Sequence, residues 1–336
     1  RSMGLEDLEE IGETYTGEVD LSQGLDLGEV FRNLARQGVE SLEGAVKDSL
    51  RSCLLILVVT ILCALAGTMT MGTGGDPLKA PVLAAALAIA AVAVGDVDSL
   101  LHLGEEAIQR MESLGDILLP AVSMAMAASG SPVAAAAKYG ATILFSDLLM
   151  ALISRLLIPL AYGFVAVHVA WAALGNDGLK GVGRLIKWII TTALSIVLLA
   201  FLAYLNFSGV ISGSADAATV KAVKFTISNL VPVVGGVISD TAETLLAGAS
   251  ILRNTAGVFG MLVILGICMG PFLNLGLHYL AYKVTAALAA TVSGDSRVTG
   301  LIEAIGSAFG LILAMTGSCG VLLAVAMISA VSTVVV

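Results

Sequence analysis

The residues of this sequence that are best suited to a chemical role are the ionisable ones inside apolar segments. Lys138 and Asp147 lie within the apolar segment at residues 133–153, and Arg155 follows it. A charge at the bilayer centre costs about 2.5–3.5 kcal/mol on insertion scales, so each side chain should face protein or water. Asp147 and Arg155 are about 80° apart around a helix and can share a face. A structural ion pair or snorkelling is one interpretation; an ion or substrate path, with Asp147 as the candidate intramembrane charge, is the other.

Histidine and cysteine side chains show no spacing that predicts catalysis or metal binding. His102 stands beside Glu105 and Glu106 but has no second histidine nearby, which favours a solvated interfacial helix over a metal site. The four cysteines lack the CxxC spacing of metal and redox motifs. Neither Gly-x-Ser-x-Gly nor His-Glu-x-x-His occurs. We therefore expect no enzyme, no cofactor and no bound metal.

The composition indicates a membrane protein. The 336-residue chain is 57% hydrophobic and 13% charged, with a mean hydropathy of +0.97, whereas soluble domains carry about 25% charged residues. The chain has 26 acidic and 17 basic residues, and residues 1–52 hold 12 of the acidic and 5 of the basic ones. The net charge of −9 therefore mainly describes that segment. The sequence predicts an all-α, polytopic helical membrane protein in contact with a lipid bilayer. A basic surface for nucleic acid is not indicated.

The membrane part contains about seven to ten apolar segments. The first, residues 53–71, is uncharged and long enough to cross about 30 Å of hydrocarbon. Two others, residues 117–130 and residues 230–238, are short and interrupted by proline or glycine, which is typical of re-entrant or broken helices. The candidate broken-helix or pore elements are Pro120, Pro232, Gly235 and Gly236.

Two acidic residues, Asp240 and Glu243, follow the second interrupted segment. Carboxylates at the start of a helix accept hydrogen bonds from its free backbone N–H groups. A helix cap is therefore one interpretation of this pair, and a gating role is the other.

Charge and hydropathy also divide the chain into parts. Residues 1–52 are predicted to form an acidic soluble leader plus an amphipathic helix, and residues 53–336 a membrane domain. Residues 53–113 of that domain hold the first two spans and an interfacial helix. Residues 114–207 and 226–336 are the two units of an expected internal repeat.

Proline spacing is the basis for the repeat. Pro120 and Pro232 are 112 residues apart, and so are Pro159 and Pro271. Short, interrupted segments at matching places in two halves indicate a transporter-like core with binding near the midplane.

Positive charge in one short loop suggests the orientation. Residues 176–187 contain Lys180, Arg184 and Lys187 against a single acid, Asp177, which predicts a cytoplasmic loop. Counting the crossings back from it places the acidic N-terminal segment outside, provided that residues 117–130 cross fully.

An amphipathic stripe precedes the first span. Its apolar members recur at three- or four-residue steps from Leu27 to Leu50 and include Phe31, Leu34 and Val46. The stripe needs a cover, which is either the membrane domain itself, a partner protein or lipid. Its net negative charge disfavours an anionic lipid surface.

One stretch resembles a known family. Residues 224–240 read KFTISNLVPVVGGVISD, followed by TAETLL at 241–246, NTAG at 254–257 and GDSR at 294–297; the earlier LLPA at 118–121 and AASG at 127–130 are similar too. These residues resemble the stage III sporulation protein AE family, over about residues 25–336.

The resemblance implies a function that the residues alone do not. Members of that family belong to the mother-cell membrane around the forespore and usually carry a cleaved signal peptide. With other stage III sporulation membrane proteins and stage II sporulation protein Q, they form a channel-like assembly needed for late forespore development. A structural or channel-forming component is therefore the expected function, and a secondary transporter for a small solute is the alternative.

Overall fold

Long helices make up the whole of the described structure. The computed structural model describes residues 27–70, 79–128, 132–207 and 255–332, and no strand occurs among them. The elements are α2 (Leu27–Thr70), α3 (Lys79–Ala128), α4 (Pro132–Leu152), a π-helical turn η1 (Ile153–Leu157), α5 (Ile158–Leu174), α6 (Asp177–Phe207), α9 (Thr255–Val292) and α10 (Ser296–Ser332). Six segments within them are long and apolar enough to cross a membrane. The predicted all-α, polytopic membrane fold is confirmed.

Two pairs of apolar stretches each form one continuous rod. Residues 81–95 and 117–128 both belong to α3, so the predicted segment at 117–130 does not begin a new helix. The predicted segment at 133–153 likewise continues through η1 into α5, up to Leu174. The charged stretch between the first pair does not end the helix, because Glu, Gln, Arg and Leu are strong helix formers. Arg155 lies in η1, where a π-type turn accommodates a change of register without breaking the rod.

The interruption predicted at Pro120 is not observed, because α3 continues past it to Ala128. A proline in a helix interior costs about 3 kcal/mol and usually bends the helix. Packing against α9 and α10 holds the turn before Pro120 in place. A Cβ placed on Gly115 would meet Leu323 of α10, and one placed on Gly260 of α9 would meet Leu118. The other predicted broken elements, Pro232, Gly235 and Gly236, lie outside the described residues.

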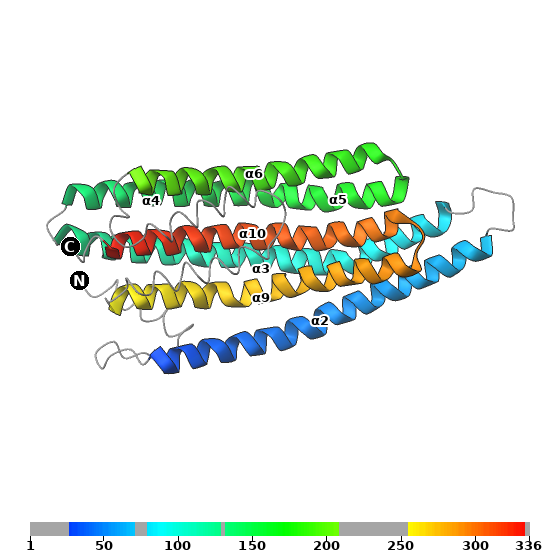
Figure 1. Ribbon diagram of the computed structural model, residues 1–336, viewed down its shortest axis with the longest axis horizontal. Helices are drawn as coiled ribbons and strands as arrows, with labels where there is room; N and C mark the ends of the chain where they lie inside the picture. The colour runs from blue at the N-terminus through cyan, green and yellow to red at the C-terminus, as the bar shows by residue number, and fades with distance from the viewer. Residues whose placement is uncertain (1–26, 71–78, 129–131, 208–254, 333–336) are drawn as a thin grey trace.

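Helix α10 is the centre of the bundle. It contacts α3, α4, α5, α6 and α9, and Figure 1 shows it between the other rods. Almost every described residue of α10 from Leu301 to Met327 is buried. Small residues allow this close approach: a Cβ on Gly306 would lie 3.0 Å from Cβ of Tyr282 in α9, and one on Gly317 would lie 2.9 Å from the ring of Phe272.

Helix α2 packs its N-terminal half against α9. Gly38, Ala45 and Ser49 are buried, and a Cβ on Gly38 would meet Sδ of Met269. The buried face of α2 therefore coincides only in part with the apolar stripe predicted from the sequence, since the stripe residues Val46 and Leu50 are 39% and 53% exposed. For the buried small residues the cover is the membrane domain itself, and α2 runs without a break across the predicted boundary at residue 52.

The helices alternate in direction. α2, the α4–η1–α5 rod and α9 run one way, and α3, α6 and α10 run the other (Figure 1). The turns α5–α6 and α9–α10 consequently lie at one end of the bundle, and the beginnings of α2, α4 and α9 lie at the opposite end. If the basic loop is cytoplasmic, the start of α2 is outside, as the sequence predicts.

We expect opposite labelling of the two ends in intact cells. Gly181→Cys should react with a membrane-impermeant maleimide only after permeabilisation, because the basic start of α6 is predicted to be cytoplasmic. A Cβ at Gly181 meets no atom within 4 Å, so the change fits. Arg32→Cys, on an exposed position of α2, should react without permeabilisation. Both variants need the four native cysteines replaced, and labelling of the Gly181→Cys variant from outside would show that the orientation is wrong.

Candidate functional site

A polar cleft lies between α2, α3 and α9. Its volume is about 740 Å³, and its lining combines apolar walls with charged and polar side chains. The polar lining comes mainly from Asp48, Arg51, Asp96, His102, Glu106 and His278. The cleft follows from the sequence of α3, in which the apolar start of the helix gives way to charges at Asp96. Charged side chains there do not close against the charged part of α2, so an open, water-accessible cleft remains at the surface of an apolar bundle.

A hydrogen bond between distant residues fixes one side chain of the cleft lining. The Tyr282 hydroxyl of α9 donates to Oδ2 of Asp96 over 2.7 Å. Tyr282 is fully buried, and its ring packs edge-on against Phe309 of α10, with centroids 5.1 Å apart. A hydrogen bond to a carboxylate is roughly twice as strong as one between neutral groups. The bond therefore holds the Asp96 carboxylate at the cleft and ties α3 to α9.

His278 also lines the cleft and carries a hydrogen-bond acceptor. Its side chain is only 4% exposed, and Nδ1 lies 2.9 Å from the carbonyl oxygen of Asn274. Because a carbonyl oxygen only accepts, Nδ1 must carry the proton in the neutral ring, which leaves Nε2 as an acceptor. Nε2 has no hydrogen-bond partner among the described residues. His168 in α5 is held in the same way: it is buried, and its Nδ1 lies 2.7 Å from the carbonyl oxygen of Phe164.

The polar groups that line the cleft are suited to binding a ligand. Over the described ranges 27–70, 79–128, 132–207 and 255–332, no group of three or more His, Cys, Asp or Glu side chains is placed to hold a metal ion. The described carboxylates of the cleft can accept hydrogen bonds and attract positive charge.

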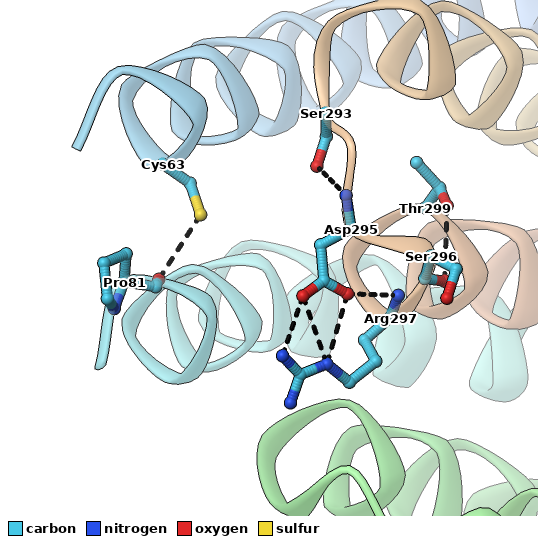
Figure 2. Close-up of polar contacts among 7 residues, drawn as sticks. All are labelled: Cys63, Pro81, Ser293, Asp295, Ser296, Arg297 and Thr299. Atoms are coloured by element: carbon cyan, nitrogen blue, oxygen red, sulfur yellow. Dashed lines mark hydrogen bonds and ion pairs between the residues drawn. The ribbon is translucent and has the colours of Figure 1, made fainter. Parts of the chain in front are cut away.

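A second polar cluster locks the α9–α10 turn, as Figure 2 shows. Oδ1 of Asp295 accepts from the backbone N–H of Arg297 at 2.8 Å and caps α10, while its carboxylate pairs with the Arg297 guanidinium at 2.7 Å. Arg297 also lies against the left-handed Gly175 that ends α5, since a Cβ there would be 3.0 Å from Nη1. The GDSR stretch thus joins the α9–α10 turn to the α5–α6 turn.

Two opposing effects set the pKa of Asp295. Burial raises it, but the hydrogen bonds and charge of Arg297 together outweigh burial and hold the pKa below its usual value. A carboxyl group with a lowered pKa stabilises the fold above its unfolded pKa, and this contribution is lost as the pH falls through the folded pKa. The cluster should therefore weaken only in acid, below about pH 4.

We expect Asp295→Ala to lower the free energy of unfolding by about 1 kcal/mol at neutral pH, because it removes a helix cap and the partner of Arg297. The difference from the wild type should shrink below about pH 4 as Asp295 becomes protonated. Thermal unfolding of the purified protein at neutral pH and below about pH 4 measures both effects. Thr299→Ala, which removes an exposed hydroxyl nearby, is the control. An Asp295→Ala difference that grows in acid would contradict the assignment.

The residues singled out from the sequence are not brought together. Asp147 lies exposed on α4 between the exposed Leu144 and Leu148, away from the cleft lining. Both Asp147 and Arg155 are described residues, and the structure shows no ion pair between them. Pro120 lies within α3, and the remaining candidates, Pro232, Gly235, Gly236, Asp240 and Glu243, fall outside the described residues. Their predicted pore, cap or gating roles stay predictions.

Sequence reasoning misses the cleft because its residues are far apart in the chain. Asp96 and Tyr282 are separated by 186 positions. A usable signal is nevertheless present: Asp96 directly follows an apolar run, and an ionisable residue at that place in a membrane helix needs a partner.

Taken together, the fold and the cleft define a multi-pass helical membrane protein with an open polar cleft between three of its helices. The chain belongs to the stage III sporulation protein AE family, whose model matches residues 19–334. A curated relative, stage III sporulation protein AE of Bacillus subtilis (strain 168), is 25% identical over 199 residues. That match covers 59% of this chain and 50% of the relative, so the chain spans about half the length of the curated relative it matches. No solved structure matches.

The family assigns this membrane protein a role in sporulation. The resemblance predicted from the sequence motifs is confirmed.

Proposed function

We propose that this protein is a non-catalytic, channel-forming component of a complex that links mother cell and forespore. It would lie in the mother-cell membrane around the forespore and act with other stage III sporulation membrane proteins and, through the complex, stage II sporulation protein Q. Family membership over residues 19–334 is the observation that carries this proposal.

The polar cleft supports a channel component over a purely structural one. A membrane anchor needs only apolar helix contacts, whereas here charged side chains of α2 and α3 line an open cleft between the helices. Buried or membrane-embedded charges are costly unless they serve a path or a partner. Channel-forming subunits need such water-accessible polar surface.

Co-purification from sporulating cells tests the proposal. A tagged chain in its native host should isolate other stage III membrane proteins, and deletion of its gene should stop late forespore gene expression after engulfment. The Asp96→Asn variant should still assemble but support less late gene expression, because the cleft is altered and the surfaces are not. Glu112→Gln, an exposed change on the same helix, is the matched control. Normal late expression in the deletion strain would contradict the proposal.

The alternative, a secondary transporter for a small solute, is favoured by the size of the cleft. Sites for organic ligands measure about 300–1,000 Å³, and this cleft measures about 740 Å³. Uptake of a radiolabelled solute into liposomes containing the purified protein alone would support it. Since Asp147 is exposed on α4 and Asp96 lines the cleft, Asp96→Asn should reduce uptake more than Asp147→Asn.

A further inference from the structure

We propose that the cleft between α2, α3 and α9 binds a primary ammonium group, carried by a free alkylamine or by an ethanolamine lipid headgroup. The inference goes beyond the proposed function and does not depend on it. It rests on the size, charge and hydrogen-bonding groups of the cleft.

Size excludes a bare ion as the best-fitting occupant. The cleft of about 740 Å³ is much larger than the share of about 30 Å³ that one water molecule takes in the liquid. Apolar side chains of Leu55, Val92, Leu100 and Leu103 contribute to its walls. An organic group with methylene carbons can cover these walls, and hydrated inorganic ions cannot.

Charge selects a cation. Three carboxylates, Asp48, Asp96 and Glu106, and one guanidinium, Arg51, line the cleft. Glu106 already pairs with Arg110 outside it, at 3.3 Å. The carboxylates of Asp48 and Asp96 are therefore balanced only by the guanidinium of Arg51, so the net charge of the cleft lining is negative.

Hydrogen bonding selects an ammonium group among cations. His278 is only 4% exposed, and its Nε2 acceptor has no partner in the described part of the chain. The Tyr282 hydroxyl donates to Oδ2 of Asp96. The other carboxylate oxygen, Oδ1, has no hydrogen-bond partner among the described residues. An ammonium group offers three donors in one compact centre and can donate to either acceptor. A quaternary ammonium group has no N–H donor and cannot do so.

Binding of radiolabelled putrescine to the purified full chain in detergent tests this assignment. Saturable binding is expected, with competition by butylamine and none by 1,4-butanediol, which has the same carbon chain but no charge. Asp96→Asn should weaken the binding at least about tenfold, because a charge-assisted hydrogen bond is lost. Glu112→Gln should leave it unchanged within about twofold, since Glu112 lies outside the cleft lining. Absent saturable binding, or equal binding by Asp96→Asn, would overturn the proposal.

A second measurement keeps the proposal testable if Asp96→Asn does not fold. In a chain without its native cysteines, Ser99→Cys places a thiol in the cleft lining. Aminoethyl methanethiosulfonate should modify it at least about tenfold faster than the sulfonatoethyl reagent, because the local charge is negative, and putrescine should slow the reaction. Equal rates for the two reagents, or no protection, would count against an ammonium site.

Nanodiscs distinguish the two sources of the ammonium group. If putrescine binds more weakly in nanodiscs of phosphatidylethanolamine than in nanodiscs of phosphatidylglycerol, the ethanolamine headgroup competes for the cleft and is its occupant. Equal putrescine binding in both kinds of nanodisc assigns a free amine.

Discussion

Gly306→Leu is expected to lower the free energy of unfolding by about 3 kcal/mol, the upper range for overpacking a tight core. At Gly306, α10 crosses α9 so closely that an added Cβ would lie 3.0 Å from Cβ of Tyr282 and 3.6 Å from the backbone N of Lys283. These atoms belong to or adjoin the main chain and cannot rotate away. The larger side chain must therefore push the two helices apart at the centre of the bundle.

Thermal stability of the purified protein measures the effect. The fraction of monodisperse protein after heating, followed by size-exclusion chromatography, should show an apparent melting temperature lower by about 4 °C. Gly276→Leu is the matched control, because a Cβ on that glycine of α9 meets no atom within 4 Å. A Gly306 variant as stable as the Gly276 variant would show that the helix crossing is looser than described.

Tyr282→Phe is expected to cost about 1.5–3 kcal/mol, the range for hydrogen bonds to charged groups. The change deletes only the hydroxyl that donates to Asp96 and keeps the ring packed against Phe309. Tyr279→Phe removes the same atom one turn earlier on α9, where the described structure shows no hydrogen bond from the hydroxyl. It should leave stability nearly unchanged.

A double-mutant cycle separates the hydrogen bond from other effects of Tyr282→Phe. In an Asp96→Ala background the same change should cost much less, since its acceptor is absent. If Tyr282→Phe costs equally with and without Asp96, the hydroxyl stabilises the protein through some other contact.

The class of fold could be predicted because it depends on average properties of long segments. Apolar runs and the scarcity of charge are enough for an all-α membrane protein, and the basic residues around Lys180 and Arg184 are enough for a predicted orientation. Helix ends are harder to predict. A proline and a charged stretch both weaken a helix locally. Helix α3 nevertheless continues past Pro120, because Gly115 and Leu118 pack against neighbouring helices.

The site is less predictable than the fold, for a different reason. Asp147 stands out because it is charged within an apolar segment, but the side chain is exposed on α4. Asp96 is part of a site because helix α9 brings Tyr282 to its carboxylate and His278 to the same cleft. Helix pairing between residues so far apart leaves no periodic pattern in a single sequence. Asp295 stands in the sequence only as part of a family resemblance, and its capping role becomes visible in the structure.

The length of α3 has a mechanical consequence. Its 50 residues rise about 75 Å, whereas the hydrocarbon core of a bilayer is about 30 Å thick. Even at a tilt of about 40°, the largest common value, the core takes up only about 40 Å of the helix. The part outside the hydrocarbon is not free, because α3 stays packed against α10: a Cβ on Gly104 would meet Ile312, and one on Gly115 would meet Leu323. A displacement of α3 along its axis would therefore have to move α10 with it, or break this packing.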